Sequence, residues 1–271
     1  MNEFSVLMSI YYKEKPEYFD RAMKSIWDEQ IVKPNEIVLV QDGKLTDELI
    51  TTVSIWKNKL EDIIKIVPLE NNVGLGDALN IGLQKCTYEL VARMDTDDIS
   101  LPNRFEEQIK IFQQNNVDLC GSWIDEFESD ENEIISSRKV PEINSDIIKF
   151  SKMRNPINHP SVMFKKSSVI NAGNYKKMFS FEDYYLWIRM LMNNSNLYNI
   201  QKSLLKMRAG YDQLERRRGF TYVIYEFNFW LQLYKDGFIN LIELLKNLLI
   251  KLFIRVMPRN FVKFVYKIIR D

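Results

Sequence analysis

Three aspartates stand within four positions in the segment VARMDTDDISLPNRF, at Asp95, Asp97 and Asp98, directly after an apolar run. Carboxylates this close repel one another, so the sequence predicts a compensating positive charge beside them. A hard divalent ion such as Mg2+ or Mn2+ prefers such oxygen ligands and could in turn hold a diphosphate. The alternative is a solvated loop in which Asp98 or Ser100 caps the following helix.

A second acidic pair, Glu182 and Asp183, stands in the segment FSFEDYYLWIRM at the start of an expected helix. One of these carboxylates could act as a general base, ionised at neutral pH and placed to accept a proton. A favourable interaction with the helix dipole would also explain two acids in a first turn. Both explanations stay open at this level.

Two further segments could contact a ligand. In QDGK, Asp42 ends an apolar run, where Asp-Gly is an ordinary turn but the carboxylate could share a base or ribose pocket with residues 9–12. In NNVGLGDALN, Gly74 and Gly76 partly match the dinucleotide-binding fingerprint. Leu79 stands where the third small residue of that fingerprint belongs. Gly74 is therefore better explained as a place where the backbone approaches a ligand closely.

His159 is the only histidine, and Cys86 and Cys120 are the only cysteines, which argues against a zinc site built from several such ligands. A Ser-His-Asp triad would have to use His159. That residue lies between two prolines and is either a loop histidine satisfied by the backbone or a contact to a ligand or acceptor. In QLERRRG, Arg216 and Arg217 either belong to a solvated loop or recognise a phosphate in bidentate fashion.

Composition narrows the class of protein. The 271 residues include 37 basic and 37 acidic ones, so no global charge favours nucleic acid. The 46% of hydrophobic residues are ample for a packed core. Two cysteines in apolar surroundings favour a reducing compartment over a disulfide framework. The opening residues, MNEFSVLMSIYY, lack the basic start and long apolar run of a signal peptide.

The elements that must position these residues alternate in type over the first 120 positions. Apolar runs predict strands and helical spacing predicts helices. The expected strands are Phe4–Tyr11, Glu36–Gly43, Asp62–Leu69 and Tyr88–Asp95, and the expected helices are Pro16–Asp28, Thr46–Leu60, Gly74–Cys86 and Leu101–Asn115. This order predicts an α/β fold with a mostly parallel central sheet flanked by helices. Because ligands gather at the carboxyl ends of parallel strands, Asp42 and the aspartate cluster should lie along one edge.

The pattern loosens after residue 116. We expect strands at Val117–Phe127 and Glu133–Val140, a short helix after Asn144, a helix at Glu182–Asn193 and one or two strands at Asn196–Met207. From Arg218 onward three helical stretches are expected, broken near Gly237 and Pro258.

The last of these segments, FINLIELLKNLLIKLFIRVM, has a broad apolar face and a basic excess, with seven Lys or Arg after residue 240 against Glu243 and Asp271. Four charged residues between Leu241 and Met257 argue against a membrane span. An interfacial helix on an anionic membrane is the preferred explanation. The alternative is a helix packed on the rest of the chain.

Five segments occur in an order and spacing that resemble the family 2 glycosyltransferases, and more narrowly the bacterial enzymes that build O-antigen, capsule and exopolysaccharide repeat units. These segments are SVLMSIYYKEKPEYFDRAMKSI, EIVLVQDG, ENNVGLGDALNIGL, VARMDTDDISLPNRFEEQI and FEDYYLWIRML. The resemblance covers nearly the whole chain. It implies a GT-A fold and the inverting transfer of a hexose, galactose or glucose, from a UDP-sugar to a lipid-diphosphate-linked sugar acceptor, with a β-glycosidic product.

The resemblance also implies roles for individual residues. Asp97 would be the main ligand of Mn2+ or Mg2+, with Asp95 acting through ribose or water. Asp183 would be the catalytic base, with Glu182 beside it. The nucleotide pocket and the acceptor site would use Ser9, Tyr11, Glu14, Asp42, Gly74 and Arg93 on the donor side and His159, Arg216 and Arg217 on the acceptor side. Gln41 stands where many relatives have Asp, and Lys44 stands where many have Ser. Both departures bear on the expected contacts to uridine.

Domain boundaries and location follow from the same resemblance. Residues 1–210 would form the catalytic domain, divided into a nucleotide-sugar half at 1–115 and an acceptor half at 116–210. Residues 211–271 would form a helical segment on the inner face of the cytoplasmic membrane, with no nucleic acid as partner. The alternatives are a sugar-nucleotide nucleotidyltransferase, for which YYKEKPE lacks the expected glycine- and lysine-rich loop, and a non-catalytic membrane-associated scaffold.

Overall fold

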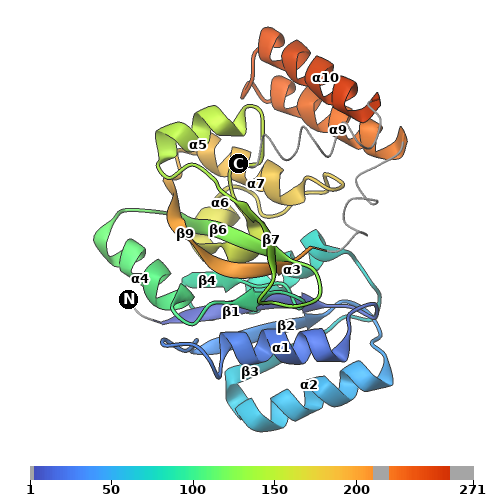
Figure 1. The fold of residues 1–271 in the computed structure, drawn as a ribbon, viewed down its shortest axis with the longest axis vertical. Coiled ribbons are helices and arrows are strands. Elements are labelled where there is room, and N and C mark those ends of the chain that lie inside the picture. Colours follow the sequence, from blue (N-terminus) through green and yellow to red (C-terminus); the bar gives the residue numbers. More distant parts are fainter. Residues whose placement is uncertain (1–2, 210–219, 257–271) are drawn as a thin grey trace.

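A single mixed sheet forms the centre of the molecule in a computed structural model that describes residues 3–209 and 220–256 (Figure 1). Its strands are β1 (Phe4–Ile10), β2 (Glu36–Gln41), β3 (Ile64–Pro68), β4 (Leu90–Arg93), β5 (Ile99–Ser100), β6 (Leu119–Phe127), β7 (Ile134–Arg138), β8 (Met163–Lys165) and β9 (Leu197–Arg208). The α-helices are α1 (Pro16–Ile26), α2 (Asp47–Leu60), α3 (Leu75–Lys85), α4 (Arg104–Gln114), α5 (Asn144–Ser151), α6 (Lys166–Asn171), α7 (Glu182–Met192), α9 (Phe220–Lys235) and α10 (Leu241–Val256). Short 3-10 turns, η1 and η2, occupy Glu61–Ile63 and His159–Ser161.

The strands run in the order β3-β2-β1-β4-β8-β6-β9-β5, with β7 paired to β6. The first four pair in parallel, as the strand–helix alternation predicts, and their carboxyl ends meet at one edge. The α/β architecture is therefore confirmed, and each of the eight expected elements before residue 116 is present within a few residues of its predicted bounds.

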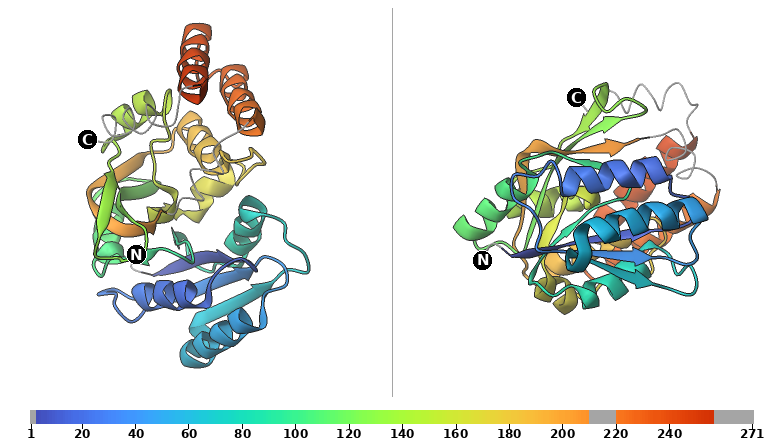
Figure 2. Two further views of the ribbon diagram at one scale, coloured as in Figure 1. Left: turned by 45° about the vertical axis from the view of Figure 1, so that its right-hand side comes forward. Right: turned by 90° about the horizontal axis from the view of Figure 1, so that it is seen from below.

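Alternating side chains of the central strand explain why both faces of the sheet are buried. Val6, Met8 and Ile10 pack with helices α1 and α2 in one hydrophobic cluster. Leu7 packs with helix α3 and, farther along the same face, helix α7 in another. Two buried faces require a nearly continuous apolar strand, which is the pattern that the sequence carries. Figure 2 shows helices on both sides of the sheet.

The second half of the sheet is mixed. β8 runs antiparallel to β4 and to β6, whereas β9 runs parallel to β6, and β7 forms the expected antiparallel partner of β6. The short elements β5, β8 and α6 escaped the sequence analysis because two to six residues carry too little periodicity to be recognised. They matter for function, since β8 brings the turn η2 beside the end of β4.

Helices α9 and α10 lie at the opposite end of the molecule from α2 (Figure 1). Aromatic side chains of α9 pack on α7, where the rings of Phe181 and Phe229 stack at 4.6 Å between centroids. Part of the C-terminal segment therefore packs on the rest of the chain, although several apolar side chains of α10 stay exposed. No helix in the described ranges combines the length and apolarity needed to cross a bilayer. The third expected helix, beyond Pro258, lies outside the described residues.

Candidate active site

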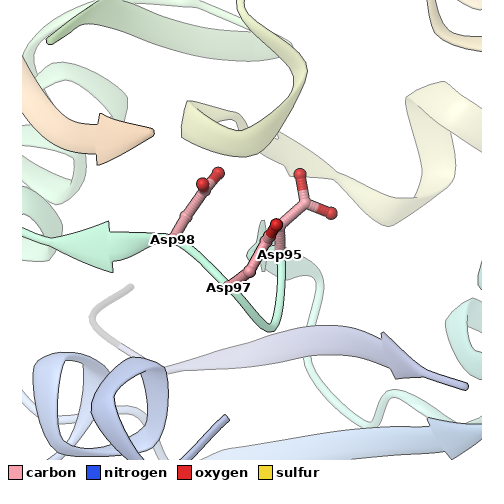
Figure 3. A group of neighbouring side chains, drawn as sticks. All are labelled: Asp95, Asp97 and Asp98. Atoms are coloured by element: carbon pink, nitrogen blue, oxygen red, sulfur yellow. The ribbon is translucent and has the colours of Figure 1, made fainter. Parts of the chain in front are cut away.

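The aspartate cluster forms one tight turn between β4 and β5 (Figure 3). One carboxylate oxygen from each of Asp95, Asp97 and Asp98 lies within 4.8 Å of the others. Helix α4 begins only at Arg104, with Asn103 at its N-cap, so the alternative in which Asp98 or Ser100 caps that helix is wrong. Asp98 is instead 1% exposed, so the turn is not a solvated loop either.

Two arginine side chains and one backbone N–H offset the negative charge of the cluster. Arg93 ion-pairs with Asp95, and its side chain is 2% exposed. The backbone N–H of Arg208, at the end of β9, donates a 2.9 Å hydrogen bond to Asp98 Oδ1, and the end of β9 points toward Asp98 in Figure 3. The buried guanidinium of Arg104 also feels the charges of Asp98 and Asp95, although burial lowers its pKa to about 9.

Two carboxylates of the cluster, those of Asp97 and Asp98, have raised pKa values, which a bound cation would lower. Burial, Asp95 and Glu14 together raise the pKa of Asp97 to about 7. Burial and the charges of Asp97 and Asp95 raise the pKa of Asp98 well above its usual value. Asp98 Oδ2 is buried and has no hydrogen-bond partner within the described residues. Crowded carboxylates with an unsatisfied oxygen fit a hard divalent ion, which would relieve their repulsion.

Glu14 joins this corner from the loop after β1. Its carboxylate accepts a hydrogen bond of 2.5 Å from Thr96 Oγ1, inside the aspartate turn, and one of 2.8 Å from the N–H of Lys15. Burial is the main cause of its raised pKa. The sequence analysis placed Glu14 in the nucleotide pocket, and the structure brings it beside the cluster.

The other donor-side residues lie along the same edge of the sheet. Ser9 is the last but one residue of β1 and is partly buried, whereas Tyr11, just beyond the strand, is 36% exposed. Asp42, directly after β2, is buried and accepts hydrogen bonds from Val73 N–H at 2.7 Å and Gly74 N–H at 3.1 Å. Asp42 thus fixes the loop that leads into α3, and its predicted contact with the nucleotide stays a prediction.

Gly74 takes the N-cap position of α3 with φ +89°, a left-handed conformation that favours glycine. No atom lies within 4 Å of the place where a Cβ would stand. The backbone is therefore open at this point, as a close approach to a ligand requires.

Glu182 and Asp183 begin helix α7, in the half of the chain that is predicted to bind the acceptor. Asp183 Oδ2 accepts a 2.8 Å hydrogen bond from Asn155 Nδ2. A Cβ on Gly76 of α3 would lie 3.6 Å from Cγ of Glu182, so the starts of α3 and α7 are in contact. Burial, with Asp183 contributing, raises the pKa of Glu182.

His159 and Tyr175 connect the two sides. His159 Nε2 lies 2.9 Å from Tyr175 Oη. The charges of Arg93, Asp183 and Asp95 all act on that phenol, whose pKa is raised by burial. Arg93, Asp95, Asp183 and His159 therefore all lie near the Tyr175 hydroxyl, and their predicted roles stay predictions. Arg216 and Arg217 lie outside the described residues.

Arg104 and Gln108 form a buried connection beneath the site that the sequence analysis missed. Arg104 donates a 2.7 Å hydrogen bond to the carbonyl of Arg93, at the end of β4. Gln108 donates one of 2.7 Å to the carbonyl of Ser161, in the turn that begins with His159. Helix α4 thus ties the aspartate turn to the histidine turn. Two polar residues four apart in an otherwise amphipathic helix were the available signal.

Acids at the carboxyl edge of a parallel sheet, with a second acid at the start of a separate helix, are typical of a nucleotide-sugar transferase. Residues 5–179 match the family described as Glycosyl transferase family 2. The chain belongs to the family 2 glycosyltransferases, and it is a glycosyltransferase of the GT-A fold type.

Curated relatives match over nearly the full length. The chain is 39% identical over 266 residues to UDP-Gal:alpha-D-GlcNAc-diphosphoundecaprenol beta-1,3-galactosyltransferase of Escherichia coli, covering 98% of this chain and 95% of that protein. It is 41% identical over 268 residues to the amylovoran biosynthesis glycosyltransferase AmsE of Erwinia amylovora, covering 97% and 98%. The predicted relationship to enzymes of surface polysaccharide synthesis is therefore confirmed.

Solved structures share the fold at low identity. S. aureus TarS in complex with UDP-GlcNAc superposes with a TM-score of 0.65 at 18% identity, covering 86% of this chain and 66% of that one. The mannosyltransferase PcManGT from Pyrobaculum calidifontis, in complex with GDP-Man and Mn2+, gives 0.59 at 14%, covering 84% and 61%. The chain thus spans less than two thirds of the length of these two structures.

Proposed function

We propose that this enzyme transfers a hexose, with galactose the first candidate, from its UDP-sugar to a sugar attached through a diphosphate to a lipid. The proposal is supported by the Escherichia coli relative, whose name states UDP-galactose as donor and a GlcNAc-diphospholipid as acceptor. The observation that carries it is the arrangement of two acidic groups, one in the aspartate turn and one at Asp183, around the single phenol of Tyr175.

Asp183 is the proposed base. It would accept the proton of the acceptor hydroxyl while that oxygen forms a bond to the anomeric carbon and the bond from this carbon to the diphosphate breaks. The electron pair of the broken bond leaves with UDP. Attack from the face opposite the leaving group inverts the configuration, which gives a β-glycoside from an α-linked donor. Asn155 holds the Asp183 carboxylate in place through its 2.8 Å hydrogen bond.

The donor side would hold the nucleotide and the metal. Asp97 and Asp95, with Asp98 behind them, fit Mn2+ or Mg2+, and the positive charge of that ion would stabilise the diphosphate as it leaves. Ser9, Tyr11, Glu14 and Asp42 would line the nucleotide pocket, and Gly74 would let the backbone approach the diphosphate. The ion pair of the buried Arg93 side chain with the partly exposed Asp95 would keep the aspartate turn in one conformation.

Membrane attachment completes the proposal. Exposed apolar side chains line α10, at Leu241, Ile242, Leu245, Leu249 and Ile250, with exposed fractions from 37% to 77%. Lys246 is exposed on the same helix and Lys235 ends α9. An apolar helix face with basic neighbours suits the interface of an anionic membrane. The lipid-linked acceptor would be met there, on the cytoplasmic side.

A direct assay tests this proposal. The purified chain, Mn2+ and a synthetic N-acetylglucosaminyl diphospho-lipid are incubated with UDP-galactose or UDP-glucose, and the product is analysed by mass spectrometry and NMR. We expect one donor to give a β-linked disaccharide and free UDP. A scaffold would release no UDP, and an α-linked product would contradict inversion.

A further inference from the structure

His159 is held by one neutral partner. Its turn, η2, lies beside the end of β4, because the N–H of Arg93 donates a 2.8 Å hydrogen bond to the carbonyl of Val162. Among the described residues, Tyr175 Oη at 2.9 Å is the only hydrogen-bond partner of the imidazole ring. The His159 side chain is partly buried, and its other ring nitrogen, Nδ1, makes no hydrogen bond within the described residues.

Tyr175 is fixed firmly enough to orient that ring. Its side chain is 4% exposed within the core beneath α3. Asn80 of α3 accepts a 2.9 Å hydrogen bond from the N–H of Tyr175 and donates one of 2.8 Å to its carbonyl. Both backbone groups of Tyr175 are thus tied to α3, the helix whose N-cap is Gly74.

The electrostatic surroundings keep the imidazole uncharged. Burial and the positive charge of Arg93 lower the pKa of His159 well below its usual value. A neutral imidazole has one N–H and one lone pair, so Nδ1 is a donor if Nε2 accepts from the phenol, and an acceptor if Nε2 donates. A sugar hydroxyl can satisfy either arrangement, whereas a phosphate oxygen can only accept.

We propose that Tyr175 is a positioning residue that holds His159 so that its Nδ1 contacts a hydroxyl of the acceptor sugar, and not the acceptor diphosphate. This role rests on the proposed function. Tyr175 lies where it can do this, since Arg93 and Asp95 of the donor side and Asp183 of the acceptor side all act on its hydroxyl. The Asn80–Tyr175–His159 chain of hydrogen bonds would then set the position of the acceptor relative to the donor.

The experiment compares Tyr175→Phe, which removes one oxygen and keeps the buried ring, with the wild type. The acceptors are N-acetylglucosaminyl diphospho-lipid, a set of analogues that each lack one sugar hydroxyl, and the corresponding monophosphate. We expect Tyr175→Phe to raise the KM for the full acceptor about 3- to 10-fold, the range for one neutral hydrogen bond. The KM for UDP-galactose should not change. For the analogue that lacks the contacted hydroxyl, wild type and variant should have the same KM. The monophosphate acceptor should raise the KM of both enzymes by the same factor.

Two further variants separate positioning from general damage. His159→Gln keeps a neutral hydrogen-bonding group and should retain more acceptor affinity than His159→Leu. Tyr198, on β9, donates a 2.5 Å hydrogen bond from its phenol to Glu142. Tyr198→Phe removes that bond and should behave as wild type. The role is overturned if Tyr175→Phe has the wild-type acceptor KM, if donor and acceptor KM rise together, or if the losses multiply for every deoxy analogue. An inactive wild type would overturn the proposed function and this role with it.

Discussion

The backbone N–H of Arg208 donates a 2.9 Å hydrogen bond to the buried Oδ1 of Asp98, across 110 residues of sequence. Its guanidinium carbon also lies 3.8 Å from the centre of the Tyr18 ring. The end of β9 therefore closes the wall behind the aspartate turn and connects it to α1. The aspartate turn is thus held in part by β9, a strand from the second half of the chain.

Replacing Asp97 by Asn should nearly abolish transfer, with a loss of about 100-fold or more in kcat, because the proposed metal site loses its main carboxylate. Calorimetric titration should show weaker binding of UDP with Mn2+, while circular dichroism shows a native fold. Asp62→Asn, which changes an exposed acid in the turn η1 before β3, serves as the control. Full activity of Asp97→Asn would remove this residue from the metal site.

The raised pKa of Asp97 predicts a dependence of stability on pH in the absence of divalent ions. Because the folded pKa, about 7, exceeds that of the unfolded chain, this group favours the folded state below pH 4 and loses that contribution as the pH rises to 7. The melting temperature should fall over this window, and Asp97→Asn should flatten the fall. Mn2+ should raise the melting temperature more at pH 8 than at pH 5. Equal curves for both proteins would contradict this.

Asp183→Asn should lower kcat by about 10²- to 10⁴-fold, the usual contribution of a general base. Binding of UDP with Mn2+ should be unchanged, since Asp183 belongs to the acceptor side. Glu182→Gln should have a smaller effect, because its side chain packs against the start of α3. Steady-state kinetics and calorimetry check both variants, and a reversed order would exchange the two roles.

Arg104→Met should destabilise the fold by roughly 2–3 kcal/mol, because it leaves the buried carbonyl of Arg93 without its charged donor. Lys110→Met lies on the exposed side of the same helix and forms an ion pair with Glu106, so it should change stability by less than about 0.5 kcal/mol. Urea unfolding of both variants measures the difference. Equal stability of the two would show that the buried connection does not hold the aspartate turn.

Ile242→Glu combined with Leu249→Glu should weaken the binding of the chain to vesicles of anionic phospholipid. These side chains are 77% and 69% exposed, so the fold should be preserved. Ile55→Glu changes a side chain of similar exposure, 59%, on α2 at the other end of the molecule. Co-sedimentation should separate the two proteins, and undiminished binding of the double variant would exclude α10 as the contact.

The parallel half of the fold could be predicted from sequence because each element there is long enough to show its period. Pro16 marks the start of α1, and the apolar run of β2 has no other explanation than a buried strand. β8 has three residues and β5 has two, so neither carries a readable pattern. Their existence follows from pairing with strands that are distant in the chain, and pairing is a tertiary property.

The site shows the same division. The three aspartates could be recognised from the sequence because crowded like charges require a compensating group. Arg208 could not be recognised, since its contact with Asp98 is made by a backbone N–H that any residue other than proline carries. Tyr175 was equally hidden, because a single tyrosine in a loop looks like one of the 13 in the chain.

Helix α7 carries Asp183 in its first turn, and the stacked rings of Phe181 and Phe229 bind that turn to α9. The proposed base and the helical pair that is proposed to contact lipid are therefore joined by direct packing. In such an enzyme the reaction would take place at a fixed distance from the bilayer surface. Short glycans near their lipid would be extended, and longer ones would carry their ends out of reach.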